Sequence, residues 1–193
     1  IQYYTNMDEM NLDSDDWVVG EDYSVAPTCA TCHLSATPDM PVTHDAGARI
    51  SWNLRAPVSK LQADWETKRQ NMQDVCKNCH GTDFYEGHYE QLDGFVHLYN
   101  EKFAKPATEI MGILRKNGSL PNPASFSNKV EWIYWEIWHH EGRRARHGAA
   151  MMGPDYAWWH GIYEVGQHFY FKFIPEVQKL HDAEADAYIA ELM

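Results

Sequence analysis

The stretch Cys29-Ala-Thr-Cys32-His33 decides how the rest of the chain is interpreted. It has the spacing of a haem-attachment signal, in which two cysteines separated by two residues are followed directly by a histidine. Two thiols at this spacing add across the two vinyl groups of one haem, and the adjacent histidine reaches the iron as its proximal ligand. A second copy, Cys76-Lys-Asn-Cys79-His80, follows 47 residues later, and the two motifs contain all 4 cysteines of the chain. The sequence therefore predicts two covalently attached haem c groups, with His33 and His80 as iron ligands.

Three other uses of paired cysteines compete with haem attachment. Two C-x-x-C pairs can build a four-thiolate zinc site. Here the pairs stand wider apart than in a usual zinc ribbon, and zinc gives no reason for a histidine directly after each pair. A thioredoxin-like redox pair needs a βαβ setting, which the sequence does not contain. Disulfide bonds are the remaining alternative, and we rank it below zinc.

The composition suits a protein that wraps haem. The chain has 193 residues, with 8 Trp, 11 Tyr and 11 His. Aromatic side chains pack well against flat macrocycles, and multihaem proteins need two axial nitrogens per iron. The formal net charge of -12 argues against partners such as nucleic acid or anionic membrane surfaces, and it favours a basic redox partner. There is no run of about 18 apolar residues, so we expect no transmembrane segment.

The beginning of the chain bears on where the protein resides. It reads Ile-Gln-Tyr-Tyr and turns acidic at once, which is not the pattern of a signal peptide. Because c-type cytochromes are assembled outside the cytoplasm, we expect a periplasmic or equivalent extracytoplasmic compartment, which would be the anammoxosome in an anammox-type organism. We expect the chain to be either mature after cleavage or a piece of something longer.

Hydrophobic periodicity predicts a mainly α fold, and the two motifs make the chain a multihaem cytochrome c with haem-wrapping loops. No β-strand pattern of any length is present. We divide the chain into a dihaem-binding region, 1–105, and a C-terminal helical region for haem ligation and subunit contacts, 106–193. A short helix is expected within 1–28 and a loop over 34–59. The further expected helices span 60–80, 86–104, the residues before the Asn117-Gly118 stop, 129–147 and the stretch from 156 onward.

Histidines outside the motifs are candidates for the second axial position of each iron. His44 lies in a loop just past the first motif, where the adjacent carboxylate of Asp45 could fix its tautomer. His140 and His147 are seven residues apart and lie nearly on one face of a helix, so two haems packed along that helix could each take one. His139 is the reserve candidate. For each of them the alternative is a packing or surface role.

Basic and aromatic residues add two expectations about the C-terminal region. The guanidinium groups of Arg143, Arg144 and Arg146 suit bidentate hydrogen bonds with haem propionates. The alternative there is an aromatic core helix with a basic, solvated end. The aromatic residues at 169–171 and 173 run around their helix, and a helix of that kind is buried on all sides, often between subunits. This pattern predicts an oligomer.

Six longer stretches carry more information than the spacing of single residues. They are DYSVAPTCATCH (22–33), PVTHD (41–45), ISWN (50–53), WHHEGRRARHG (138–148), MMGPDY (151–156) and WHG (159–161). Together they resemble hydroxylamine oxidoreductase and the related hydrazine dehydrogenases, which are octahaem cytochromes c. The resemblance covers nearly the whole chain, but it matches only the C-terminal part of that family, which carries the last two haem motifs.

The resemblance implies a largely helical fold whose long C-terminal helices hold a homotrimer together. In that family most haems are bis-His coordinated and carry electrons, and one catalytic haem is bound by a motif upstream of anything in this chain. In the oxidative members a tyrosine from a neighbouring subunit is covalently bonded to the catalytic haem, and Tyr156 matches that residue. The resemblance therefore implies oxidation of a small nitrogen compound, hydroxylamine or hydrazine, with a soluble cytochrome c as electron acceptor.

The first six haem motifs of that family are missing from this sequence. We expect the chain to be one piece of a longer or cleaved polypeptide, or a separate subunit that assembles with the chain carrying the other haems and contacts those haems. A stand-alone dihaem electron carrier with an acidic docking surface is the competing hypothesis. A reductase of nitrite or nitric oxide is the least compatible with Tyr156, because the reductive relatives lack that tyrosine.

Overall fold

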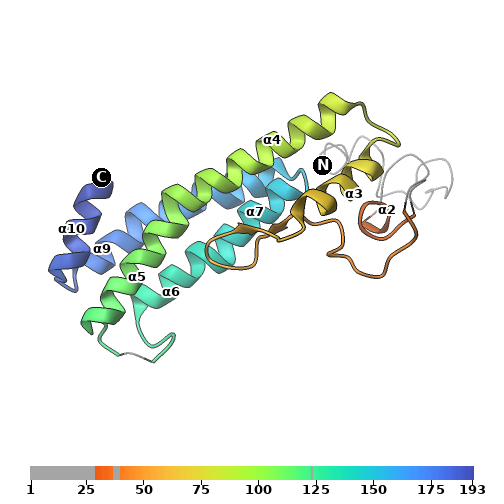
Figure 1. Ribbon diagram of the computed structural model, residues 1–193. Coiled ribbons are helices and arrows are strands. Elements are labelled where there is room, and N and C mark those ends of the chain that lie inside the picture. The colour runs from red at the N-terminus through yellow and green to blue at the C-terminus, as the bar shows by residue number, and fades with distance from the viewer. Residues whose placement is uncertain (1–28, 37–39, 123) are drawn as a thin grey trace, which may run out of the picture. The chain divides into compact units, whose positions relative to one another are not determined.

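The computed structural model describes residues 29–36, 40–122 and 124–193 (Figure 1). The short helix expected within residues 1–28 lies outside the described residues. Internal contacts divide the chain into two units. One comprises the described residues of Ile1–Asn53 together with Leu61–Tyr89, and the other comprises Leu54–Lys60 and Glu90–Met193. The boundary predicted at residue 105 differs from this division, because residue 105 lies inside the second unit.

The first unit contains both cysteine motifs on short elements. Helix α2 (Cys29–His33) carries the first motif, and helix α3 (Trp65–Cys76) ends at the second. Helices α2 and α3 contact each other. The guanidinium carbon of Arg69 lies 4.8 Å from the centroid of the Trp65 ring and 4.4 Å from that of Tyr89, so Arg69 joins α3 to the first turns of α4 (Thr82–Tyr99).

The segment between the two motifs is mostly loop, as the sequence predicts, with two short strands in it. Strand β1 (Trp52–Asn53) pairs with β2 (Lys60–Leu61). The helix predicted over 60–80 begins only at Trp65, because the backbone of Lys60 and Leu61 is engaged in β2.

The second unit consists of long helical runs. Helix α4 continues through a π-helical segment, η1, into α5; α6 continues through η2 into α7; and η3 continues through α8 and η4 into α9, after which comes α10. The bounds are η1 Asn100–Ala104, α5 Lys105–Asn117, α6 Lys129–Trp135, η2 Glu136–Glu141, α7 Gly142–Ala150, η3 Asp155–Tyr163, α8 Glu164–His168, η4 Phe169–Phe173, α9 Ile174–Gln178 and α10 Ala183–Leu192. The predicted mainly helical fold is confirmed. In the described residues, no helix has both the length and the apolar character that crossing a membrane requires.

Two of the π-helical segments explain how prolines fit inside these runs. Segment η1 ends two residues before Pro106, and η4 ends two residues before Pro175. A proline has no N–H to donate and its ring clashes with the carbonyl four residues earlier, which breaks a regular α-helix. A π-helical turn shifts the backbone hydrogen bonds by one residue. The helix predicted over 86–104 is therefore continuous with the next one, instead of ending before Pro106.

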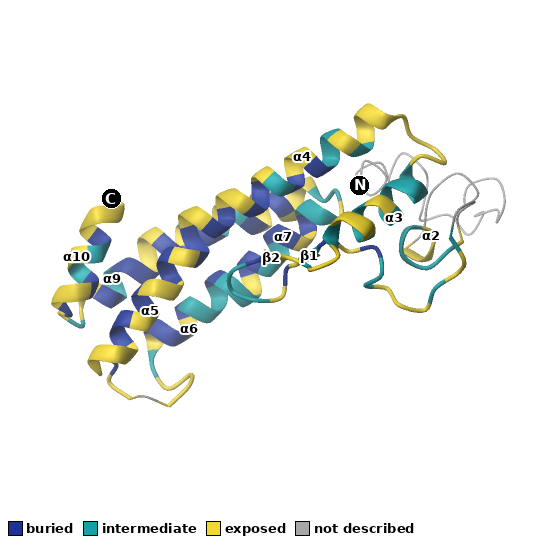
Figure 2. Cartoon of the chain, in the orientation of Figure 1, coloured by how far each residue is buried: buried dark blue, intermediate teal, exposed yellow. Residues whose placement is uncertain are grey.

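Apolar residues from the helical runs form the core of the second unit, which Figure 2 shows as dark blue along the inner faces of the helices. In α5 the buried residues include Ala107, Ile110, Met111 and Leu114, at the i, i+3, i+4, i+7 spacing of one helix face. Complete burial of a side chain such as leucine or isoleucine stabilises the fold by about 1.5–3 kcal/mol. Helix α10 packs on α5 through this face.

Capping residues set the ends of several helices. Gly118 ends α5 with a φ of 68°, a left-handed conformation that glycine adopts without strain, so the predicted Asn117-Gly118 stop is confirmed. At the start of α10, the side chain of Asp182 accepts hydrogen bonds from the amides of Glu184 and Ala185. The same carboxylate accepts from Ser119 Oγ and Asn117 Nδ2. Asp182 thus attaches α10 to the end of α5.

Helix α7 and η3 approach each other closely, through small residues. A Cβ on Gly161 would lie 2.7 Å from Ala145 Cα, and one on Gly148 would lie 2.8 Å from the amide nitrogen of Ala157. Ala145 and Ala157 are buried at the same contact, with Phe95 of α4 packed against them. The side chain at each of these positions is either a methyl group or a single hydrogen atom. The two backbones can therefore approach each other closely here.

The first prediction concerns the cap at Asp182. We expect Asp182→Ala to lower the free energy of unfolding by about 1–2 kcal/mol, since it removes the N-cap of α10, and Asp182→Asn to cost less, because an amide oxygen can also cap. The hydrogen bonds from Ser119 and the Ala185 amide lower the pKa of Asp182 in the folded state. The ionised carboxylate therefore stabilises the fold above an unfolded-state pKa of about 4, and this contribution disappears as the pH falls through the lower folded-state pKa.

Denaturant unfolding followed by circular dichroism, at neutral pH and near pH 3, measures this contribution. The stability difference between wild type and Asp182→Asn should shrink in acid. A difference that grows in acid would contradict the assignment.

The second prediction concerns the α7–η3 contact. We expect Gly161→Ala to destabilise the protein by about 1–3 kcal/mol, because the added methyl group overpacks against Ala145. Gly112→Ala in α5 is the matched control, since a Cβ there has no atom within 4 Å. That control should raise stability by about 0.5–1 kcal/mol through backbone entropy. Thermal unfolding of both variants tests the contact, and equal effects would refute the close approach.

Candidate haem-binding site

The first cysteine motif has a geometry that suits haem attachment. Cys29 and Cys32 are three residues apart on α2, which places both thiols on one side of the helix. His33 follows at the last position, and its Nδ1 lies 3.3 Å from the carbonyl oxygen of Ala46. With Nδ1 donating to that carbonyl, Nε2 keeps its lone pair free, which is the usual arrangement of a metal-binding histidine.

A buried arginine holds the backbone of this motif. Arg49 is only 2% exposed, and its Nη1 donates to the carbonyl oxygen of Cys32 at 2.9 Å. Its Nη2 donates to the carbonyl oxygen of Ser35. These carbonyls are at the end of α2, where no further helical turn supplies donors. Arg49 therefore fixes the segment that carries Cys32 and His33.

The second motif occupies the turn that ends α3. Cys76 is the last residue of the helix, and the amides of Cys79 and His80 donate to its carbonyl oxygen at 3.1 and 2.9 Å. The imidazole of His80 is exposed and stacks on the ring of Phe84, with 3.9 Å between centroids and 12° between planes. This stacking orients the predicted proximal ligand of the second haem.

The thiols of the two motifs lie near one another within the first unit. Burial raises the pKa of Cys32, and the thiols of Cys29 and Cys79 raise it further, although Arg49 acts in the opposite direction. Burial likewise raises the pKa of Cys76, with a contribution from Cys32. All four cysteines are free thiols. Two haems attached here would be neighbours.

The same geometry bears on the alternative uses of the cysteines. Within the part of the chain that the structure describes, no three His, Cys, Asp or Glu side chains converge as they would around a metal ion. The free thiols, with an imidazole directly after each pair, match the donor set that haem c requires. The residues present therefore fit a covalently attached haem at each motif.

His44 is exposed in the loop after the first motif. The Asp45 carboxylate, expected to fix the tautomer of His44, accepts instead from the Gly47 amide at 2.8 Å. The loop turn is closed further by the Asp45 amide, which donates to Thr43 Oγ1 at 3.1 Å. Iron ligation by His44 stays a prediction.

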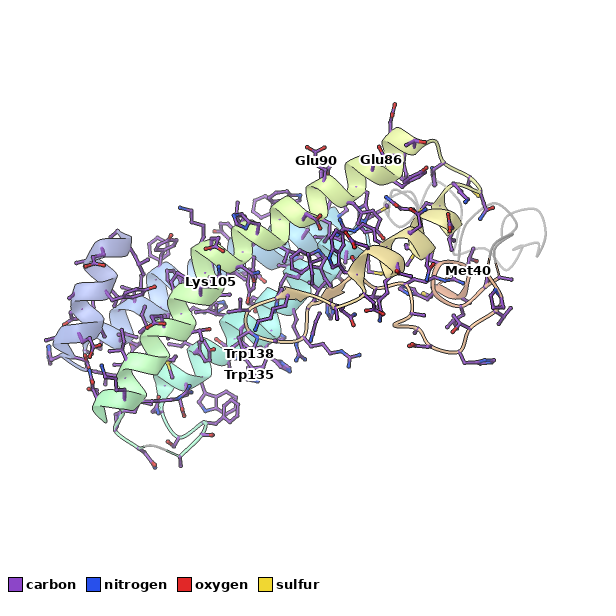
Figure 3. The ribbon with its side chains drawn as sticks, in the orientation of Figure 1. Met40, Glu86, Glu90, Lys105, Trp135 and Trp138 are labelled. Atoms are coloured by element: carbon purple, nitrogen blue, oxygen red, sulfur yellow. The ribbon has the colours of Figure 1, made fainter. Side chains whose placement is uncertain are left out.

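The other ligand candidates come from the second unit, in the run α6–η2–α7. His139 and His140 lie in the π-helical segment η2, and His147 lies in α7. The wider turn of a π-helix changes which side chains share a face, and such segments are frequent at functional sites. The aromatic side chains of Trp135 and Trp138 project from the same run (Figure 3). The imidazole of His139 stacks on Trp135, with 4.4 Å between ring centroids.

His140 is exposed and is held by a buried carboxylate. Its Nδ1 lies 2.9 Å from Oε1 of Glu141, whose side chain is 8% exposed. Burial raises the pKa of Glu141, and a hydrogen bond with Glu164 raises it further. Arg144 joins both carboxylates, with Nη2 at 3.4 Å from Glu141 and Nη1 at 3.1 Å from Glu164.

His147 is exposed and lies in a basic environment. Partial loss of hydration lowers its pKa, and the guanidinium groups of Arg146, Arg143 and Arg55 lower it further. A neutral imidazole keeps a lone pair that can bind iron. Ligation by His147, and by His140, stays a prediction.

The three arginines of this run have different surroundings. Arg146 is completely buried, and it donates to the carbonyl oxygens of Gly142, Ala56 and Trp138 and to Ser59 Oγ. These partners differ from the haem propionate that the sequence predicts for it. Arg143 donates to the carbonyl oxygen of Arg55 at 2.7 Å, and Arg144 pairs with the two carboxylates. For Arg143 and Arg144 the propionate role stays a prediction.

Tyr156 is exposed at the start of η3, with 57% of its surface accessible. Its backbone lies against Gly148 of α7, so its position depends on the close contact between these two elements. The ring of His160 is its aromatic neighbour, with 6.3 Å between centroids. The phenol therefore extends outward from a tightly packed backbone.

Arg49 and Glu141 are site residues that the sequence analysis did not single out. Arg49 acts on a carbonyl 17 residues earlier, and no local pattern indicates such a contact. Glu141 is part of the WHHEGRRARHG stretch, but its burial is visible only in the folded chain. A charged residue directly next to a candidate histidine ligand is the one signal that could have indicated it.

Comparison with known proteins relates this chain to a protein family and to a solved structure. The model of the family described as "Seven times multi-haem cytochrome CxxCH" matches residues 2–126, well over half of the chain. Among solved structures, the chain is similar to the Kuenenia stuttgartiensis reducing HAO-like protein complex Kustc0457/Kustc0458, with a TM-score of 0.63 and 17% sequence identity over 93% of this chain. It spans about half of that solved chain, 51%, and at this identity the likeness shows the fold alone. No curated protein matches the sequence.

The family match includes both C-x-x-C-H motifs and the loop that hydrogen-bonds His33. These are the parts of the structure whose free thiols and oriented imidazole fit a haem. The cofactor predicted from the motifs is thus covalently bound haem c, and the chain belongs to the multi-haem cytochrome CxxCH family.

Proposed function

We propose that this chain is part of a multihaem oxidoreductase that oxidises hydroxylamine or hydrazine, and that it relays the electrons through bis-His haems. The observation that carries the proposal is the adjacency of the two haem motifs in the first unit, where α2 and α3, the helices that carry them, contact each other. Bound haem c would supply one-electron transfer. The cysteines of the two motifs would attach the groups by thioether bonds, and His33 and His80 would be iron ligands.

The oxidative direction of the proposal rests on Tyr156. Its exposed phenol, on a backbone fixed against Gly148, is suited to reach a group outside its own chain. By its resemblance to the oxidative family members, we propose that Tyr156 forms a covalent bond with the catalytic haem of a neighbouring subunit. That haem belongs to another part of the assembly, with a soluble cytochrome c as acceptor and an extracytoplasmic location.

Two competing functions remain testable. A stand-alone dihaem electron carrier is favoured by the strongly acidic composition, with a net charge of -12. A reducing enzyme is favoured by the similar solved complex, which is described as reducing. Neither alternative needs a covalent bond at Tyr156, so that bond distinguishes them from the oxidative proposal.

An exposed aromatic stripe supports assembly with further copies of the chain. Tyr156, Trp159, Tyr163 and Tyr170 are 40–66% exposed and follow one another at intervals of three, four and seven residues. They lie on the run η3–α8–η4, and aromatic side chains are enriched in protein–protein interfaces. We propose that the stripe contacts neighbouring subunits, in the homotrimer that the resemblance implies.

The third prediction tests the cross-link. Denaturing gel electrophoresis with haem staining, and intact-mass spectrometry beside it, should show a heavy haem-containing species in the wild type, because a covalent bond survives denaturation. In Tyr156→Phe that species should disappear and leave the polypeptide that contains this chain. The matched control is Tyr163→Phe, since both tyrosines are 57% exposed. A wild-type mass equal to one chain plus two haems would instead identify a separate dihaem carrier without the bond.

The fourth prediction tests the aromatic stripe. We expect the double variant Trp159→Ser, Tyr163→Ser to lower the solution mass measured by analytical ultracentrifugation to that of a single protomer, with its haem content unchanged. Phe171→Ser is the control, because Phe171 is 79% exposed but lies off the stripe. An unchanged mass in the double variant, or an equal loss in the control, would exclude the stripe as the subunit contact.

A further inference from the structure

We infer that Glu141 is a positioning residue that fixes the tautomer of His140, and that it thereby selects His140 over the adjacent His139 as a haem-iron ligand. The inference rests on the proposed function only in so far as haem iron is present in the assembly. It deepens that function by assigning the role of iron ligand within a pair of neighbouring histidines.

The contact between His140 and Glu141 sets which ring nitrogen is free. Nδ1 of His140 lies 2.9 Å from Oε1 of Glu141. With Oε1 of Glu141 as the acceptor, Nδ1 carries the hydrogen and Nε2 keeps its lone pair. The His140 side chain is 55% exposed while that of Glu141 is 8% exposed, so a fixed, buried carboxylate holds an imidazole that can meet iron. A carboxylate behind a metal-binding histidine orients the ring and strengthens its basicity.

His139 has the opposite arrangement. Its Nε2 lies 3.0 Å from Nη1 of Arg143. A guanidinium only donates, so this contact uses the Nε2 lone pair. Nδ1 of His139 is buried without a hydrogen-bond partner, and the ring is stacked on Trp135. No accessible lone pair is left on His139, although the two histidines are adjacent in the sequence.

Arg144 and Glu164 hold Glu141 in place. Nη2 of Arg144 lies 3.4 Å from Oε2 of Glu141, and Nη1 lies 3.1 Å from Oε2 of Glu164. The same Nη2 lies 3.3 and 3.4 Å from the two ring nitrogens of His140, so its contact with Nε2 is longer than the 3.0 Å contact between Arg143 and Nε2 of His139. The carboxyl group is thus anchored by an arginine whose contact with the proposed ligand atom is at the long end of the hydrogen-bond range.

The fifth prediction compares four variants of the haem-loaded protein, purified in the assembly in which it occurs. Electron paramagnetic resonance and redox titration are the measurements. His140→Ala should convert one low-spin ferric haem to high spin, whereas His139→Ala should leave every low-spin signal in place. Glu141→Ala should raise the midpoint potential of the haem that His140→Ala converts, because a less basic imidazole stabilises ferric iron less. Glu141→Gln, which keeps an acceptor oxygen, should restore part of that shift.

Glu131→Gln is the control, since Glu131 is also a buried carboxylate, 5% exposed, in the same helical run. It should leave all haem signals and potentials unchanged. The inference is overturned if His139→Ala removes the low-spin signal, if both Glu141 variants keep the wild-type potential, or if Glu131→Gln shifts it equally. Should Glu141→Ala fail to fold, the Glu141→Gln titration decides. Haem content by intact mass, unchanged in all variants, separates these results from a failure of the proposed function.

Discussion

The buried guanidinium of Arg146 is the interaction on which the second unit depends. A cation taken out of water is costly unless hydrogen bonds and nearby dipoles replace its hydration. Here three backbone carbonyls and the Ser59 hydroxyl accept its N–H groups, and its guanidinium carbon lies 4.3 Å from the centroid of the Tyr99 ring. Burial raises the pKa of Tyr99 to about 12, so the phenol stays neutral beside it. One side chain thereby joins α4, α7 and residues 54–60.

That attachment matters because the neighbouring residues carry the proposed chemistry. His140 and His147 lie on either side of Arg146 in the same run, and Tyr156 follows on a backbone packed against Gly148. Small residues bring α7 and η3 together, while π-helical segments change the direction of side chains without ending the helices. The rigid parts are buried, and the candidate ligands extend from them to the surface. This is the arrangement expected of a scaffold that presents side chains to a large cofactor.

Much of the helical fold could be predicted from local sequence. The end of α5 at Gly118 and the helix that carries His140 and His147 follow from periodicity and from a glycine signal, which act within a few residues. Local sequence could not predict that the helix continues through Pro106. The π-helical turn that accommodates this proline is a property of the packed backbone. The start of α3 at Trp65 also differed, since Lys60 and Leu61 pair with β1 and that pairing is not visible in a hydrophobic pattern.

By itself, the sequence determined the cofactor chemistry: the spacing of Cys29, Cys32 and His33 and its repetition at Cys76, Cys79 and His80 are set by covalent geometry, which needs no tertiary context. Only the tertiary structure decided which polar groups are available. The sequence makes Arg146 a candidate for a haem propionate, but in the folded chain it is buried and donates to carbonyl and hydroxyl groups of the protein. His139 and His140 are equivalent in a linear pattern, yet Nε2 of His139 lies against Arg143, whereas Nδ1 of His140 is held by Glu141. The reason is physical, because hydrogen-bond partners are chosen by distance in the folded chain and not by separation along it.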